Sequence, residues 1–181
     1  MVILMKLFLI YATLGWILEI IFISYGKKKI INTHFLFLPF CPMYGIAGLL
    51  IHHITNYQDN IFIIFILSII ISIIIEYTTS YLMEKIYHHK WWNYKRKKYN
   101  LKGRICLINT IEFGILGIIV KYLNPSLTSL TIPNSIITIV TILFIIDLII
   151  STIYTYIITN NHKYNKNFLT KKINYKLNNI P

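Results

Sequence analysis

The chain has 181 residues, of which 56% are hydrophobic and 13% are charged, and its mean hydropathy is +0.61. This composition excludes an ordinary soluble domain and is typical of a membrane protein with several spans. The formal net charge of +12 does not indicate a nucleic-acid-binding protein, because the Lys and Arg residues cluster between apolar runs instead of covering one soluble face. We therefore interpret the basic residues as a signal of membrane topology.

Five apolar stretches are long enough to cross a bilayer as helices, which takes about 20 residues each. They cover residues 3–25, 35–54, 61–84, 105–123 and 135–158. We predict an all-α bundle of about five transmembrane helices over residues 1–160, followed by a basic cytoplasmic tail over 161–181. No small-residue cleavage site follows the first stretch, so we interpret it as a helix and not as a signal peptide.

The segments between these stretches alternate in basic content. Residues 55–60 and 124–134 contain no Lys or Arg, whereas the other connections and the tail are rich in them. Cytoplasmic loops carry the excess of Lys and Arg, so the pattern predicts an N-terminus outside and a C-terminus inside. The basic residues concerned are Lys27, Lys28 and Lys29; Lys85, Lys90, Lys95, Arg96, Lys97, Lys98, Lys102 and Arg104; and Lys163, Lys166, Lys171, Lys172 and Lys176.

Ala and Arg each occur only twice, while Ile, Lys and Asn are abundant. The rare types have GC-rich codons, so this bias indicates an AT-rich bacterial genome. We expect a multi-pass protein of the bacterial cytoplasmic (inner) membrane.

The second stretch contains Pro39 and Pro42, followed by Tyr44 and Gly45. Proline breaks or kinks a helix, so this stretch is either a kinked span or a re-entrant loop. A re-entrant segment would put a basic cluster on both membrane faces, and we therefore favour a kinked crossing.

Residues 85–104 combine cations with aromatic rings, a composition typical of a segment at the lipid headgroups. We expect the Lys residues of this loop to contact anionic lipid and expect no nucleic-acid partner. The central residues of the segment are Trp91, Trp92, Asn93 and Tyr94.

Four of the six acidic residues fall inside apolar stretches: Glu19, Glu76, Glu112 and Asp147. A carboxylate in hydrocarbon is costly, so each is a candidate functional residue. With a rise of about 1.5 Å per residue, the three Glu lie roughly 9 to 12 Å below the cytoplasmic boundary, and Asp147 lies about 16 Å deep. We predict a polar site or ion pathway; the alternative is that the acids only join helices by hydrogen bonds.

Polar side chains also recur every four residues on two of the stretches, which places them on one helix face. We expect both faces to point into the bundle. They consist of Ser68, Ser72, Glu76 and Ser80, and of Asp147, Ser151 and Thr155.

Near the cytoplasmic boundary, Arg104 is the natural ion-pair partner of Glu84 or Glu76. We predict that Glu84, Arg104 and Asn109 form the cytoplasmic mouth of the polar site. The pairs His52-His53 and His88-His89 fall on opposite sides of the membrane in this topology, and Cys41 and Cys106 lack CxxC spacing. We therefore expect no metal site and no cofactor.

No nucleotide-binding P-loop and no hydrolase or protease motif is present in the sequence. We expect a protein that is not an enzyme, and any ATP-driven activity then needs another subunit. An intramembrane enzyme that uses Glu84, His88 or His89 on lipid headgroups is a weaker alternative.

Several separated motifs resemble the bacterial ABC-transporter type IV, or CmpB-like, membrane protein family. They cover roughly residues 7–125 and lie at 15–19, 35–45, 76–85 and 91–107. The chain departs from the usual pattern at Thr33 and His34, at Leu38, and at Asn93, where the family usually has Asp. The resemblance implies a transporter permease that works with an ATPase or another membrane subunit. The alternative function is a non-transporting membrane scaffold or regulatory protein. Among its partners we also consider a second copy of the chain, in a homo-oligomer.

Overall fold

The computed structural model describes residues 2–27 and 35–160. The predicted tail over 161–181 and the predicted cytoplasmic Lys28 and Lys29 lie outside the described residues. The helices and strands, in chain order, are α1 Val2–Lys27, α2 Pro42–Thr55, α3 Ile61–Tyr87, β1 Asn100–Leu101, β2 Ile105–Cys106, α4 Leu107–Ser129 and α5 Asn134–Asn160.

Four helices in the described part of the chain are long and apolar enough to cross a membrane. Their spans are Val2–Phe22, Ile61–Tyr87, Leu107–Ser129 and Asn134–Ile157. Large apolar side chains cover much of their outer surface, as expected where helices face lipid. The predicted all-α membrane bundle is therefore confirmed.

The second predicted helix is shorter than expected, because residues 35–41 are not helical. We call Phe35–Cys41 the entry segment. Pro39 and Pro42 lack the N–H that a helix interior requires, and Pro42 occupies the first turn of α2, where this loss costs nothing. The prediction of one helix over 35–54 was thus wrong for its first seven residues, and the expected break at the prolines is present.

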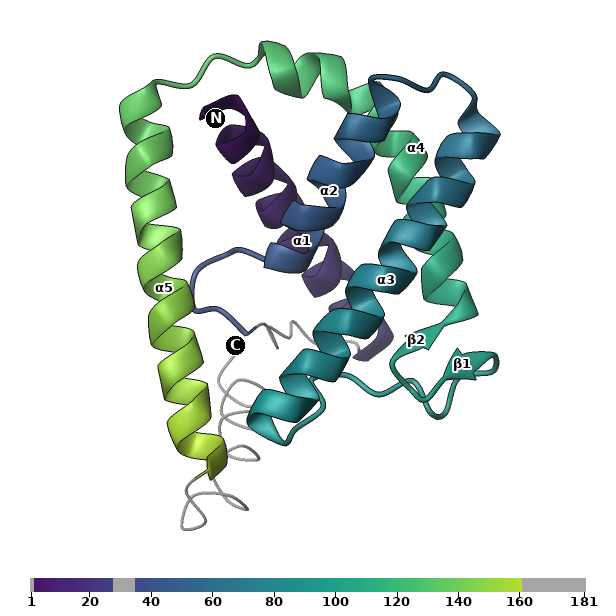
Figure 1. Cartoon of the computed structure of the whole chain (residues 1–181), viewed down its shortest axis with the longest axis vertical. Coiled ribbons are helices and arrows are strands. Elements are labelled where there is room, and N and C mark those ends of the chain that lie inside the picture. Colours follow the sequence, from purple (N-terminus) through teal and green to yellow (C-terminus); the bar gives the residue numbers. More distant parts are fainter. Residues whose placement is uncertain (1, 28–34, 161–181) are drawn as a thin grey trace.

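The chain runs back and forth between two ends of the bundle (Figure 1). One end, which we call the pocket end, holds the start of α1, the α2–α3 turn and the α4–α5 connection. The hairpin end holds the end of α3, the β1–β2 hairpin and the end of α5. The basic loop over 85–104 thus lies at the same end as the C-terminus of α5.

Glycines allow two helix pairs to approach closely. On α1 and α2, the ring of Tyr44 lies against Gly15, and the ring of Phe8 lies against Gly45. On α3 and α4, Ser68 lies against Gly117. A Cβ at any of these glycines would overlap its neighbour, which is the small-residue packing that membrane helices use in place of a hydrophobic driving force.

Helix α5 stands at the side of the bundle in Figure 1. A buried apolar cluster attaches it to α1 and to the entry segment. Rings of Phe40 and Phe8 meet Phe144 of α5 edge to face, at centroid distances of 5.6 and 5.3 Å. The entry segment therefore fills space between α5 and the remaining helices.

The basic loop contains a small fold that the sequence did not predict. Antiparallel strands β1 and β2 pair Asn100 with Cys106. Asn100 also donates to the Lys97 carbonyl at 2.7 Å, and Trp92 Nε1 donates to the Arg104 carbonyl at 2.8 Å. Gly103 has φ of +70°, a backbone conformation that favours glycine. The loop is thus a structured element on which Tyr94 is held in place.

A candidate polar site at the hairpin end

The polar face predicted on α3 points into the bundle. Ser68, Ser72, Glu76 and Ser80 are all buried, and Glu76 is only 3% exposed. The spacing of four residues therefore predicted the inward face correctly. Glu76 is the carboxylate at the centre of the candidate site.

A hydrogen-bonded chain joins Glu76 to the surface of the hairpin. The Tyr94 hydroxyl is hydrogen-bonded to the Glu76 carboxylate and accepts from Asn109 Nδ2 at 2.7 Å. Asn109 Oδ1 in turn accepts from the exposed Lys97 ammonium at 3.0 Å. The second carboxylate oxygen of Glu76, Oε2, is buried and has no hydrogen-bond partner in the structure.

Glu19 of α1 acts on the same site through its charge. Its charge acts on Glu76, Tyr44 and Tyr94, so α1, α2, α3 and the hairpin loop converge there. Burial, followed by the nearby Glu76 carboxylate, raises the pKa of the Tyr94 hydroxyl well above its ordinary value. Tyr94 therefore stays protonated and remains a hydrogen-bond donor at neutral pH.

Two of the three predicted mouth residues, Glu84 and Arg104, form an ion pair beside the site, whereas Asn109 belongs to the hydrogen-bonded chain. Arg104 Nη2 lies 2.5 Å from Glu84 Oε2, and Lys90 Nζ lies 3.5 Å from Glu84 Oε1. Arg104 Nη1 donates to Ser80 Oγ at 3.3 Å, one helical turn from Glu76. The guanidinium also lies over the rings of Tyr77 and Tyr81, at 5.6 and 5.5 Å. Arg104 thus pairs with Glu84 and not with Glu76.

Asp147 has a different environment from the Glu76 site. Its Oδ1 accepts from the Phe37 amide at 3.2 Å and from Ser151 Oγ at 3.1 Å, and its Oδ2 accepts from the Leu38 amide at 2.9 Å. The predicted inward face of α5 is present, since Asp147, Ser151 and Thr155 are buried. Asp147 thus holds the entry segment in place. The Phe37 and Leu38 amides lie outside any helix, and the carboxylate supplies the acceptors that a helix would otherwise provide.

Glu112 does not join the site, although its depth matches that of Glu19 and Glu76. It lies on the exposed face of α4, next to exposed Ile108, Ile111 and Ile115. Depth along a helix says nothing about which side a residue occupies. The structure therefore does not bring Glu112 together with Glu19 and Glu76.

The aromatic residues predicted for the membrane interface pack largely on protein. Trp91 meets the rings of Phe35, Tyr87 and His89 at centroid distances of 5.4, 6.2 and 5.8 Å. Asn93 is exposed and its Oδ1 accepts from the Lys95 amide. Burial lowers the pKa of His89 below its ordinary value. This cluster connects the entry segment to the basic loop.

Within residues 2–27 and 35–160, no three His, Cys, Asp or Glu side chains come together as a metal site would require. The two histidine pairs lie at opposite ends of the bundle. His52-His53 is near the end of α2, at the pocket end, and His88-His89 comes directly after α3, at the hairpin end. What the candidate site offers is two carboxylates with tyrosine hydroxyls and an amide. Such groups can hold a proton or a cation.

Sequence comparison assigns the chain to a family. The model of the family described as "Putative ABC-transporter type IV" matches residues 6–156. The chain belongs to this family. The type IV family match confirms the resemblance and extends it from residue 125 into α5, so that it includes Asp147 as well as Glu19, Glu76 and Arg104. No curated protein and no solved structure matches the chain.

The sequence did not predict Lys97 as part of the chain of hydrogen bonds that leads to Glu76. It appeared only as one of several cations in a basic loop. Pairing across the hairpin puts Lys97 beside Asn109, twelve positions later. No local spacing rule links the two residues, so only the folded loop reveals the contact.

Proposed function

We propose that the chain is a permease-like subunit of a bacterial transporter, with a polar site at Glu76 and Glu19 that opens toward the hairpin end. The observation that carries this proposal is the buried Oε2 of Glu76, which has no partner in the structure. A carboxylate kept in this state inside a helix bundle is expensive unless a proton, cation or solute uses it. Membership of a family named for ABC transporters supports the same role.

The proposed topology has five crossings, with the N-terminus outside and the hairpin end in the cytoplasm. Helix α2 alone, with 14 residues, spans about 21 Å, which is less than the roughly 30 Å hydrocarbon core. The entry segment would complete the second crossing. Asp147 and the neighbouring aromatic rings would shield its backbone from lipid.

In this proposal, the Tyr94–Asn109–Lys97 chain links Glu76 to the cytoplasmic surface, and the Glu84–Arg104 pair borders the mouth. The sequence contains no P-loop, so a separate ATPase would supply energy, and the exposed basic hairpin is the surface we propose for its docking. The remaining cations of the loop would contact anionic lipid. The proposed role is not enzymatic.

The test is a double variant, Glu19→Gln with Glu76→Gln, expressed in place of the native chain in its bacterial host. We expect loss of the phenotype that the intact gene provides, with an unchanged amount of folded protein in the membrane. Glu112→Gln is the matched control, because it removes the same charge at the same depth but on the exposed face of α4. An active double variant of normal stability would contradict a functional site.

A non-transporting scaffold is the second candidate, and Asp147 favours it. Both oxygens of that carboxylate bind groups of the chain itself, so an acid of a membrane helix here has a structural use. If Glu76 had the same use, its Gln variant would unfold at a lower temperature in detergent. Co-purification separates the two roles further, since only the permease requires an ATPase partner.

A further inference from the structure

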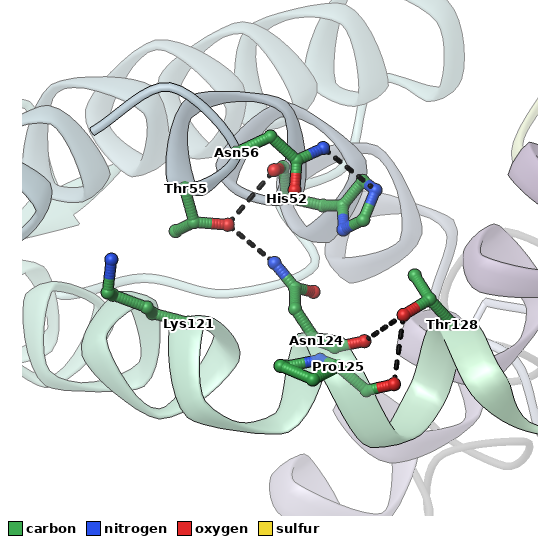
Figure 2. A pocket seen from close by; sticks show the side chains of 7 residues that line it. All are labelled: His52, Thr55, Asn56, Lys121, Asn124, Pro125 and Thr128. Atoms are coloured by element: carbon green, nitrogen blue, oxygen red, sulfur yellow. Dashed lines mark hydrogen bonds between the residues drawn. The ribbon is translucent and has the colours of Figure 1, made fainter. Parts of the chain in front are cut away.

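A second polar site lies at the pocket end, where the end of α2 faces the last turns of α4. It is a cavity of about 240 Å³, and Figure 2 shows its walls. Six of the seven residues that line it are polar or charged, and Asn56, Pro125 and Thr128 are exposed, so the cavity opens at the surface of the pocket end. The lining residues are His52, Thr55, Asn56, Lys121, Asn124, Pro125 and Thr128.

Pro125 is one of the residues that line this cavity. It lies inside α4, which stays helical to Ser129, and it has no N–H to donate to the Lys121 carbonyl, so one hydrogen bond of the helix is missing there. In Figure 1 the last turns of α4 lie across the top of the bundle. Thr128 Oγ1 donates back to the carbonyls of Asn124 and Pro125, at 2.7 and 2.9 Å. The far wall of the cavity is therefore fixed.

The hydrogen-bond acceptors on the opposite wall are already occupied. Asn124 Oδ1 accepts from the Tyr11 hydroxyl, and Thr55 Oγ1 accepts from Asn124 Nδ2. His52 Nε2 lies 3.4 Å from Asn56 Nδ2, which can only donate. This contact favours Nε2 as the acceptor, and with it the tautomer of neutral His52 that carries its proton on Nδ1.

His52 Nδ1 is the unused group. The residue is 9% exposed, and Nδ1 is buried with no hydrogen-bond partner in the structure. Figure 2 shows this nitrogen pointing into the space between Asn124 and Thr128. A buried donor without an acceptor is costly, and an occupant of the cavity that accepts a hydrogen bond would remove that cost.

The charges around the cavity favour a negative occupant. Lys6 is 7% exposed and donates to the carbonyls of Thr128 and Leu130, at 2.9 and 2.8 Å. Among the described residues, no carboxylate forms an ion pair with it. Lys121 pairs with the fully exposed Asp59 at 2.6 Å. Lys121 lines the cavity and Lys6 binds the carbonyl of the lining residue Thr128, so the two ammonium groups and one carboxylate leave a net positive charge at this end of the bundle.

We propose that this cavity binds a small oxyanion, whose oxygen accepts from His52 Nδ1 while Lys121 and Lys6 supply the positive field. A volume of 240 Å³ is several times the roughly 30 Å³ that one water occupies, so a carboxylate of a few carbons or an inorganic phosphate fits. This site is separate from the Glu76 site and does not depend on the proposed transport function.

The test is thermal unfolding of the full chain in detergent, with succinate, phosphate and neutral succinamide as probes at matched ionic strength. We expect succinate or phosphate to raise the unfolding temperature with saturation, and which of them does so identifies the class of anion. Succinamide should have no effect. No shift with either anion, or an equal shift with succinamide, would overturn the proposal, because water alone would then satisfy Nδ1.

Two variants locate the site. His52→Gln should lower the affinity for the anion at least about tenfold, which is the loss expected for one hydrogen bond to a charged group. His53→Gln is the matched control, because His53 is exposed and its ring packs on Tyr57 at 5.1 Å. Equal weakening in both variants would contradict the assignment. Should His52→Gln not fold, the ¹⁵N signal of His52 Nδ1 in the native chain must move with the anion and not with succinamide.

Discussion

Glu76 and Asp147 are both buried carboxylates in long apolar helices, and they belong to two regions with opposite arrangements. At Asp147, backbone amides of the entry segment and a serine hydroxyl occupy both oxygens. At Glu76, one oxygen meets Tyr94 and the other has no partner. The difference shows that depth and burial do not separate a structural acid from a functional one. The set of hydrogen-bond partners does.

The largest expected effect is at Asp147. Asp147→Asn turns one acceptor into a donor that faces a backbone amide, and should lower the free energy of unfolding by roughly 2–3 kcal/mol. Denaturant unfolding in detergent measures it. Ser151→Ala, which removes only one of the three bonds, should cost about 1 kcal/mol. An undiminished stability of Asp147→Asn would show that the entry segment does not depend on this carboxylate.

Tyr44, which lies near Glu76, can be displaced without a substitution of any acidic residue. Gly15→Ala places a Cβ against the ring of Tyr44 and should cost roughly 1–3 kcal/mol through overpacking. Combining it with Tyr44→Ala removes the clash, so the double variant should cost less than the sum of the two single variants. Strictly additive unfolding energies would mean that Gly15 and Tyr44 are not coupled.

The mouth next to Glu76 is expected to be less sensitive, because Glu84 is partly exposed. Arg104→Lys keeps the charge but loses the contacts to Ser80 and the flat stacking on Tyr77 and Tyr81, and should cost about 1 kcal/mol. Arg96→Lys is the control, since Arg96 is exposed on the hairpin loop. Similar unfolding midpoints for the two variants would remove any special role of the guanidinium.

The smallest effect concerns the aromatic cluster that joins the two regions. Since burial lowers the pKa of His89 in the folded chain, the unfolded chain binds the proton more readily. Stability should therefore decrease as the pH falls through about 6.5, the ordinary histidine value. His89→Gln should reduce this slope in a pH series of melting curves, whereas His88→Gln, at an exposed position, should keep it.

Much of the fold was predictable, because apolar length and spacing report directly on helices in a membrane. The stretches at 61–84 and 135–158 correspond to α3 and α5, and the polar residues spaced by four do face inward. An ion pair of Arg104 with Glu84 or Glu76 was also predicted from their places at the ends of neighbouring spans, and the structure shows the pair with Glu84. These features depend on position along one helix or on proximity to one boundary.

The parts that were missed depend on how helices rotate and on contacts between distant segments. Glu112 shares the depth of Glu76 but faces outward, and an isolated residue without a polar stripe carries no signal of direction. The Asp147 contact spans about 110 positions to a segment that was predicted to be helical. The His52 cavity is formed by residues of α2 and α4 that are more than 60 positions apart, so it appears only where these two helices pack together.

The most direct test compares Glu76→Gln and Asp147→Asn in the same two assays, unfolding in detergent and complementation in the bacterial host. Both changes replace a carboxylate with its amide of equal size. We expect Glu76→Gln to keep the native unfolding midpoint and to lose function, whereas Asp147→Asn should lose stability first. A Glu76→Gln protein that is as destabilised as Asp147→Asn, or fully functional, would contradict this expectation.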